Sequence, residues 1–252
     1  MVSESEIKLL QSFIDESQNT VFFGGAGVST ESGIPDFRSR DGLYNQKWDW
    51  PPETILSASF FYKNPSEFYR FYREKILIQG IEPNSAHKKL AEMESKGKLK
   101  AVITQNIDGL HQKAGSKTVY ELHGTTLKNH CIKCGSFYNA DYVIENKDEN
   151  GIPRCNAKIK DEICKGIIKP DVVLYEEGLD QETVSSSIKA ISESELLIIG
   201  GTSLSVYPAA GFINYFQGKH IVLINRDPTE ADSLADLVIH DSIGKVLEKI
   251  KC

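Results

Sequence analysis

The amino-acid sequence predicts an α/β fold, in which a doubly wound, parallel, Rossmann-like sheet carries a smaller second domain. Short apolar runs alternate with amphipathic helical segments, and continuously apolar strands suit a parallel sheet that is covered on both faces. Two stretches interrupt this alternation: residues 41–80 are aromatic-rich and helical in pattern, and residues 127–166 contain four cysteines. We expect both to form the smaller domain, which leaves residues 1–40, 81–126 and 167–252 for the sheet domain.

The expected strands are short, and most of them are continuously apolar. They are residues 20–23, 101–104, 118–122, 196–199, 221–224 and 236–239. The expected helices have apolar residues at helical spacing or follow a capping residue, and they cover residues 3–16, 85–94, 181–192 and 209–216. Ser85 is the expected N-cap of the second helix.

Composition and charge exclude several classes of protein. The chain has 252 residues, of which 40% are hydrophobic and 25% are charged, and this suits one sizeable core with an appended module. A net charge of −6 gives no electrostatic reason to expect nucleic-acid or anionic-membrane binding. No apolar run approaches the ~20 residues of a membrane-spanning helix, and the first 17 residues are too charged for a signal peptide. We expect a soluble, cytoplasmic, monomeric protein.

A glycine-rich turn, residues 24–33, directly follows the first expected strand. Glycine lets a backbone approach a pyrophosphate, and the N-terminus of a following helix supplies free N–H donors. The spacing departs from the G-x-G-x-x-G fingerprint, because counting from Gly25 the third glycine would fall at Thr30. By itself, the turn fits a nucleotide site and an ordinary strand-to-helix connection equally well.

Residues 33–38 then place an aromatic ring and a guanidinium beside this possible anion site. Arg38 would neutralise phosphate through its fork of donors, and Phe37 would cover an aromatic ring or exclude water. The alternative is a surface arginine and a core phenylalanine.

Polar side chains also follow the next two expected strands. Residues 104–111 carry amide and acid groups at the carboxyl edge, where open α/β sheets bind ligands. Such groups are costly to bury unless they are paired with one another or with a ligand. His123 ends the strand after that, and a histidine there is well placed as a general base. The alternatives are a self-satisfied turn network and a structural histidine.

The cysteines predict a metal site. Cys131 and Cys134 form a C-x2-C pair, whereas Cys155 and Cys164 are separated by eight residues. Four thiolates suit a closed, tetrahedral, structural zinc, which leaves no open position for a hydrolytic water. His130 is a possible rival ligand. A DNA-binding ribbon is disfavoured, because residues 127–166 hold seven basic and six acidic residues and therefore no basic patch.

Four of these blocks together resemble the signature blocks of the sirtuins, the NAD-dependent protein deacylases. They are residues 25–29, 33–38, 104–108 and 123–124, and their order and spacing match as well. Further matches are residues 170–173, 201–204 and 225–226, so the resemblance runs from about residue 13 to residue 246. The short chain is similar to bacterial members of the family.

The resemblance implies an NAD-dependent protein lysine deacetylase. Such an enzyme transfers the acetyl group of acetyl-lysine to ADP-ribose and gives deacetylated lysine, nicotinamide and O-acetyl-ADP-ribose. NAD is then a co-substrate, and the four cysteines bind one structural zinc ion. The implied catalytic residues are His123, as general base, and Asn106. The implied NAD-binding residues are Gly25, Ala26, Gly27, Thr30, Phe37, Arg38, Gln105, Asn106, Ile107, Asp108, His123, Gly201, Thr202, Ser203, Asn225, Arg226 and Ile243.

The resemblance also implies that acetylated proteins or peptides bind between the two domains as an extra strand. Its flanks would be Val172, Val173, Leu174 and Tyr175 on one side, and Leu204 and Val206 on the other. For the two valines, ordinary strand core is the alternative. Sirtuins that prefer succinyl or malonyl groups carry a tyrosine and, three residues on, an arginine; the matching positions here hold Tyr69 and Tyr72. Arg73 comes one place late, which on a helix turns it away by ~100°, so we predict a preference for uncharged acyl groups, acetyl first.

Three other functions are compatible with parts of this pattern. A protein ADP-ribosyltransferase would use the same site. A non-catalytic, NAD-sensing module would not need His123 and Asn106. An ordinary nicotinamide dehydrogenase would leave NAD unconsumed and would show a regular dinucleotide fingerprint.

Overall fold

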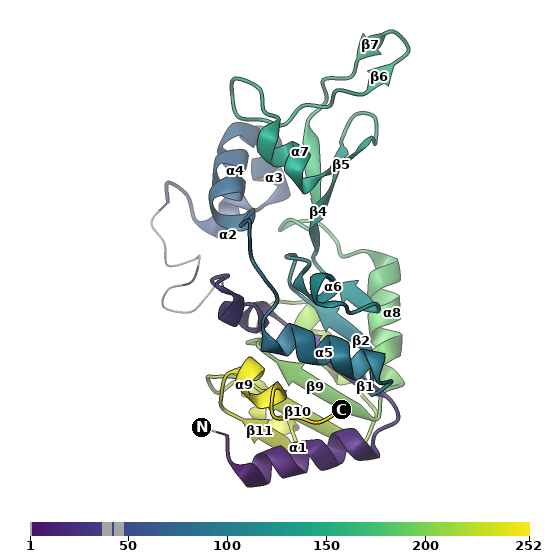
Figure 1. Cartoon of the computed structure of the whole chain (residues 1–252). Helices are drawn as coiled ribbons and strands as arrows, with labels where there is room; N and C mark the ends of the chain where they lie inside the picture. Colours follow the sequence, from purple (N-terminus) through teal and green to yellow (C-terminus); the bar gives the residue numbers. More distant parts are fainter. Residues whose placement is uncertain (1, 37–41, 43–47) are drawn as a thin grey trace.

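A computed structural model describes residues 2–36, 42 and 48–252 of the chain. Its larger body is a six-stranded sheet with the order β11-β10-β9-β1-β2-β3, in which every neighbouring pair is parallel (Figure 1). The strands are β1 (Thr20–Gly24), β2 (Leu99–Thr104), β3 (Val119–Glu121), β9 (Leu196–Gly200), β10 (His220–Ile224) and β11 (Leu237–Ile239). All six predicted strands are confirmed, and so is the predicted fold class.

Helices cover both faces of the sheet, as the doubly wound prediction requires. One face packs against α1 (Glu4–Glu16), α5 (Ser85–Ser95) and α9 (Ile243–Leu247), and the other packs against α8 (Gln181–Ser192) and the 3-10 helix Ala209–Tyr215. Side chains of β1 alternate between the two cores, with Phe22 in the first and Val21 and Phe23 in the second. A short helix, α6 (Leu110–Ala114), follows β2 and contacts α5.

Two local predictions are wrong in detail. Helix α5 begins after Asn84, whose Oδ1 accepts a hydrogen bond from the Ala86 amide at 2.9 Å, so Asn84 and not Ser85 is its N-cap. Asparagine is a good N-cap because its short side chain reaches the free amides of the first turn, and this leaves Ser85 inside the helix. The segment after residue 208 is a 3-10 helix rather than an α-helix.

The smaller body combines the two interrupting stretches. The cysteine-bearing stretch contributes β4 (Gly124–Cys131), β5 (Phe137–Asn139), α7 (Ala140–Glu145) and the hairpin of β6 (Lys158–Ile159) and β7 (Glu162–Ile163), and β8 (Ile168–Val172) follows it. The sheet β5-β4-β8 is antiparallel. The helical stretch contributes α2 (Pro52–Ile55), α3 (Ala58–Lys63), α4 (Pro65–Phe71) and a π-helical turn, Tyr72–Ile76.

One hydrophobic cluster joins these parts of the smaller body, and it contains the aromatic rings of α3 and α4 together with Val143 and Ile168. The exact boundaries of the two domains stay a prediction. No helix among the described residues is long and apolar enough to cross a membrane.

Candidate functional site

A cleft of about 570 Å³ lies at the carboxyl edge of the parallel sheet, between the larger and smaller bodies. Its volume is typical of a small-molecule site. The strand order reverses at β1, and this switch point is where doubly wound sheets bind ligands. The predicted residues that line it are Gly25, Ala26, Gly27, Thr30, Gln105, Asn106, Ile107, Asp108, His123, Val172, Val173, Leu174, Tyr175, Gly201, Thr202, Ser203, Val206, Asn225, Arg226 and Ile243.

Three predicted site residues are not among the described residues that line the cleft. Phe37 and Arg38 lie outside the described residues. Leu204 is absent from the cleft wall and packs instead against the core cluster on the α8 face of the sheet. Its backbone is left-handed, with φ of 53°, and this conformation is uncommon for a residue that carries a Cβ.

The glycine-rich turn packs closely against the loop after β9. The Gly27 amide donates to the Gly201 carbonyl at 2.8 Å, and a Cβ built on Gly27 would lie 2.8 Å from the Gly201 Cα. A side chain here would therefore force two cleft-lining loops apart. The expected helix after β1 is replaced by two short 3-10 turns, Ala26–Val28 and Thr30–Ser32. This loop therefore does not present the free backbone amides of a long helix to the cleft.

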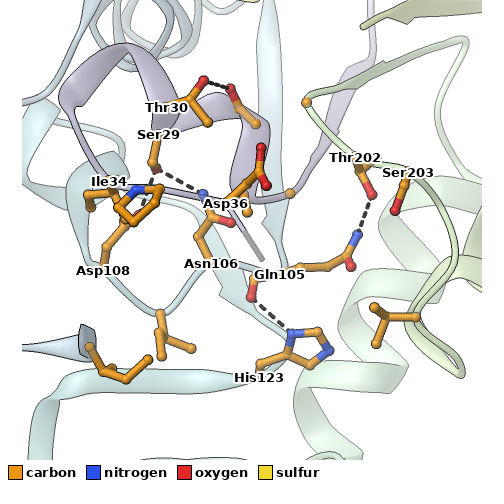
Figure 2. A pocket seen from close by; sticks show the side chains of 18 of the residues that line it. Ser29, Thr30, Ile34, Asp36, Gln105, Asn106, Asp108, His123, Thr202 and Ser203 are labelled. Carbon is orange, nitrogen blue, oxygen red and sulfur yellow. Dashed lines mark hydrogen bonds between the residues drawn. The ribbon is translucent and has the colours of Figure 1, made fainter. Parts of the chain in front are cut away.

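A buried hydroxyl links the two polar residues after β2. Ser29 is 1% exposed, and its Oγ donates to Asp108 Oδ2 at 2.7 Å and accepts from Asn106 Nδ2 at 3.0 Å (Figure 2). The Leu110 amide holds the other Asp108 oxygen at 2.9 Å. Because the Asn106 NH₂ is occupied, its carbonyl oxygen remains as an acceptor. Ser29 lies within the first signature block, residues 25–29, but it is not among the site residues predicted from the sequence.

Behind this network lie two buried imidazoles. The His87 ring is 3.5 Å from Ser29 Oγ through its Nε2, and its Nδ1 accepts from the Asn84 amide at 3.3 Å. The His111 ring packs edge-on against it, with centroids 4.7 Å apart. Burial lowers the pKa of both rings, so both are neutral at neutral pH. Neither residue was predicted to be near the site, because nothing local in the sequence marks the contact with Ser29.

The orientation of His123 fixes which of its nitrogens is available. Nδ1 lies 2.9 Å from the Gln105 carbonyl, as Figure 2 shows. A carbonyl only accepts, so Nδ1 carries the proton and Nε2 keeps its lone pair. Burial lowers the pKa of His123, and the bond to the Gln105 carbonyl opposes this shift. Gln105 in turn donates from Nε2 to Thr202 Oγ1 at 3.0 Å, so the loops after β2 and β9 are tied together across the cleft.

The turn after His123 connects this base to the wall of the smaller body. The Val173 amide donates to the His123 carbonyl at 2.9 Å. Gly124 has φ of 74°, and a Cβ there would lie 1.9 Å from the Asp171 carbonyl oxygen. Strand β8 ends at Val172, and residues 173–175 therefore lie beyond it. Residues 203–206 also belong to none of the described strands.

The four predicted cysteines form one cluster, with all four Sγ atoms within 4.8 Å of one another. Cys131 and Cys164 are 3.7 Å apart, and Cys134 and Cys155 are 3.5 Å apart. Zinc–thiolate bonds of ~2.3 Å in a tetrahedron place sulfurs ~3.8 Å apart, so the cluster fits zinc. The long spacing between Cys155 and Cys164 still closes the site.

Neighbouring residues shape this cluster. His130 does not join it, because its Nδ1 pairs with Asp171 at 2.8 Å. Gly166, which sequence reasoning did not single out, has no space for a side chain, because a Cβ would lie 2.6 Å from Cys131 Sγ. Its position two residues after Cys164 is the feature of the sequence that could have identified it as part of the cluster. Cys252 is exposed and lies outside the cluster.

The residues expected to select the acyl group have separate environments. Tyr69 is buried within the smaller body, and its hydroxyl donates to the Ile168 carbonyl. Arg73 donates from Nη2 to the Val143 carbonyl at 3.2 Å and also bonds the Gly151 carbonyl. Tyr72 is the member of the three that lines the cleft. The guanidinium is therefore engaged elsewhere, in line with the predicted rotation, while the acyl preference stays a prediction.

Comparison with known proteins adds the family. A family model described as the Sir2 family matches residues 25–208. The chain belongs to the Sir2 family. It is 56% identical over 250 residues to a Clostridium perfringens protein named NAD-dependent protein deacetylase, covering 98% of this chain and 99% of that one. A Clostridium acetobutylicum protein of the same name is 55% identical over 252 residues, with 99% and 100% covered.

Solved structures of Sir2 proteins have the same fold. One, a Sir2 variant described with a deacetylated p53 peptide and 3′-O-acetyl ADP ribose, has a TM-score of 0.88 at 37% identity, covering 96% of each chain. Another, described as Sir2 with a p53 peptide and NAD+, has a TM-score of 0.85 at 38% identity, again covering 96% of each chain. The predicted sirtuin resemblance is confirmed.

Proposed function

We propose that this Sir2-family chain is an NAD-dependent protein lysine deacetylase that transfers the acetyl group of acetyl-lysine to ADP-ribose. One water molecule is consumed, and the products are deacetylated lysine, nicotinamide and O-acetyl-ADP-ribose. The observation that carries the proposal is the orientation of His123, whose Nδ1 is held by the Gln105 carbonyl at 2.9 Å inside the cleft. A base with its free nitrogen fixed in this way suits acyl transfer to a hydroxyl. The related proteins named NAD-dependent protein deacetylase support the same reaction.

The donor set of the cleft fits NAD. At one end lie the glycine-rich turn, Thr202, Ser203, Asn225 and Arg226, which offer backbone amides, hydroxyls, an amide and a guanidinium to a pyrophosphate and an adenosine. At the other end, Asn106 and Asp108 offer acceptors to a carboxamide and a ribose. When bound, NAD supplies an electrophilic ribose carbon and nicotinamide as the leaving group.

The protein's own groups then have distinct tasks. Asp108 is held by Ser29 and by the Leu110 amide, so it presents a fixed carboxylate to a carboxamide. Asn106, held through its NH₂ group, presents its carbonyl oxygen. His123 accepts a proton at Nε2 from a ribose hydroxyl, and its other proton stays on Nδ1, where it is hydrogen-bonded to the Gln105 carbonyl. The imidazolium that forms is stabilised by that bond, which is how an orienting acceptor assists a general base.

Acetylated proteins are the proposed partners. Residues 172–175 and Val206 line the same cleft, and a peptide between them would pair its backbone with theirs, with little dependence on its sequence. Sir2 structures described with p53 peptides support a peptide as the partner. Cytoplasmic location, a monomeric state and the division into two domains belong to this proposal, and sedimentation of the purified chain tests the second.

The test uses an acetyl-lysine peptide, with and without NAD, and follows both nicotinamide and peptide mass. Wild type should release nicotinamide only when both substrates are present, and the peptide should lose its acetyl group. His123→Ala should lose at least about a hundredfold in kcat. His220→Gln is the matched control, because that ring stacks on Phe13 and neither residue lines the cleft, and it should retain wild-type activity.

The same assay separates the other functions. Peptide or protein that gains the mass of ADP-ribose would indicate a transferase. Binding of NAD without turnover would indicate a sensing module, and a change in nicotinamide redox state would indicate a dehydrogenase. Any of these results in place of deacetylation would contradict the proposal.

A further inference from the structure

A second polar network lies where the parallel strands β10 and β11 end, at the part of the cleft proposed to receive adenosine. Asn225 and His240 are the first residues beyond these two paired strands. Asn225 lines the cleft, and its side chain is fixed by the Thr202 backbone. The Thr202 amide donates to Asn225 Oδ1 at 3.0 Å, and the Thr202 carbonyl accepts from Nδ2 at 2.7 Å. The backbone carbonyl of Asn225 is therefore free to accept from another neighbour.

His240 connects this carbonyl to an acidic side chain. Its Nδ1 lies 3.3 Å from the Asn225 carbonyl oxygen, and its Nε2 lies 3.1 Å from Asp232 Oδ2. Both of these oxygens are acceptors, so the ring matches them fully when each nitrogen carries a proton. The side chains of His240 and Asp232 are 39% and 25% exposed, so neither is needed to fill the hydrophobic core.

The other oxygen of Asp232 holds the far end of the same cleft-lining segment. Asp232 Oδ1 accepts the Thr229 amide at 3.0 Å and the Thr229 hydroxyl at 2.9 Å, at the start of the 3-10 helix Glu230–Leu234. Thr229 and the three residues before it line the cleft. Residues 226–228 are exposed, so packing does little to fix them. The position of this segment therefore depends strongly on contacts at its two ends, Asn225 and Thr229.

We propose that His240 is a positioning residue for NAD: together with Asp232 it links the two ends of the segment 225–229 and holds that segment ready for the adenosine half of NAD. The inference rests on the proposed NAD-dependent function. Neither His240 nor Asp232 is among the described residues that line the cleft, so the pair acts through Asn225 and Thr229. Holding a binding segment in place reduces the ordering that binding requires, and this increases affinity without a new contact to the ligand.

Loss of the link should weaken NAD binding and leave the chemical step unchanged. The proposed base His123 and the residues after β2 lie on other loops of the cleft. In His240→Ala, KM for NAD at saturating acetyl-lysine peptide and Kd for NAD by calorimetry should both rise about fivefold, the effect of one lost hydrogen bond. The value of kcat should stay within about twofold of wild type. ADP-ribose, which contains adenosine, should lose affinity by the same factor, whereas inhibition by nicotinamide, which lacks it, should not change.

His220→Ala is the matched control for a general loss of stability. His220 begins β10, and its Nδ1 lies 3.6 Å from Asp236 Oδ2, just before β11. The same two strands therefore carry a second histidine–carboxylate pair at their amino ends, and neither of its residues lines the cleft. His220→Ala should keep the wild-type KM for NAD. An equal rise of KM in His220→Ala and His240→Ala would overturn the assignment of His240.

Substitutions of Asp232 test the link from its other side. Asparagine keeps an oxygen for Thr229 and offers an NH₂ group, which the neutral His240 ring can accept at Nε2. Asp232→Asn should therefore keep KM for NAD within about twofold of wild type, whereas Asp232→Ala should raise it about fivefold or more. Asp232→Ala combined with His240→Ala should raise KM by less than the product of the two single effects, because both changes break the same link. Fully multiplicative effects would contradict a shared link.

The measurements keep this inference apart from the proposed function. If wild type binds NAD but does not deacetylate the peptide, the proposed function fails, and the binding titrations still test His240. If His240→Ala binds NAD and ADP-ribose as tightly as wild type, the assignment of His240 fails. It also fails if His240→Ala lowers kcat with KM unchanged, or if nicotinamide inhibition weakens in parallel, because His240 would then affect the whole site.

Discussion

The hydroxyl of Tyr138 lies 3.0 Å from Cys155 Sγ and also accepts the amide protons of Asn156 and Ala157. This one group therefore ties the third cysteine to the chain that follows it. The eight residues between Cys155 and Cys164 make that loop longer than in a C-x2-C pair. A hydrogen bond that fixes the start of the loop therefore restrains a longer segment. Groups around first ligands commonly tune metal affinity by tenfold or more.

We therefore expect Tyr138→Phe to retain zinc less well. Zinc release to a chromogenic chelator should be about tenfold faster than in wild type, and the melting temperature in the presence of chelator should fall. Tyr142→Phe is the matched control, because its ring packs on Tyr138 but its hydroxyl bonds the Arg154 carbonyl instead of a sulfur. Equal release rates for wild type and Tyr138→Phe would show that the hydroxyl does not support the site.

Removing the Ser29 hydroxyl should impair NAD use more than it impairs folding. Ser29→Ala leaves Asp108 and Asn106 without their shared partner, so kcat/KM for NAD should fall by about tenfold or more, while stability falls by about 1–3 kcal/mol. Ser32→Ala is a close control, because its buried hydroxyl has no partner among the described residues. Unaltered kcat/KM in Ser29→Ala would remove Ser29 from the site.

The activity should depend on pH through His123. Burial lowers the pKa of this ring, so the neutral base is already formed at neutral pH. Deacetylation measured as kcat/KM for peptide, at saturating NAD, should rise as pH increases from 5 and level off before pH 7. A rising limb centred above pH 7 would contradict the assignment of His123 as the base.

Acid should destabilise the fold through His87 and His111. Their folded-state pKa values are lowered by burial, that of His87 to about 4, whereas an unfolded histidine titrates near 6.5. Between these values the unfolded chain binds more protons, so stability is full above about pH 6.5 and is lost as pH falls towards 4. Each ring should contribute a slope of up to about 1.4 kcal/mol per pH unit. Denaturant unfolding between pH 7 and pH 5 measures this slope, and His111→Phe should reduce it.

Gly124 should be intolerant of any side chain. A Cβ would lie 1.9 Å from the Asp171 carbonyl oxygen, in addition to the strain of φ 74°. Gly97→Ala is the control for strain alone, because Gly97 has the same φ with nothing within 4 Å of its Cβ position. Gly97→Ala should lose about 1 kcal/mol of stability, and Gly124→Ala clearly more, with weaker peptide binding. If denaturant unfolding gave equal losses of stability for Gly97→Ala and Gly124→Ala, β4 and β8 would be able to move apart at no cost to fit the added side chain.

The sheet was predictable because its strands are continuously apolar and are separated by helical segments, and neither signal needs tertiary information. All six strands were expected, and so were the two interrupting stretches. The four cysteines were equally accessible, since thiolate chemistry restricts their use outside disulfides. The carboxyl-edge location of residues 105–108 and 123 followed from parallel topology, because parallel strands end at the same edge.

Long-range contacts were not predictable in the same way. Ser29 meets Asn106 and Asp108 across more than 70 residues of sequence, and no local pattern specifies that meeting. The N-cap at Asn84 was not separable from Ser85 by propensity, because both residue types are good N-caps, and the 3-10 turns after β1 depend on packing that propensity does not describe. Likewise, Tyr72 lines the cleft while Tyr69 is buried away from it, an arrangement that depends on where the smaller body's core lies.

The segments at residues 2–11 and at residue 251 are hydrogen-bonded to each other, and Val2 is hydrogen-bonded to a residue of the cleft wall. Gln11 on α1 exchanges hydrogen bonds with the Lys251 backbone, and the Val2 amide donates at 2.9 Å to Asp241, which lines the cleft. A bulky group attached next to Val2 would strain this hydrogen bond, whereas Cys252 is an exposed thiol. Surface immobilisation or fluorophore attachment is therefore best directed to Cys252, with zinc kept bound so that the other four thiols stay protected.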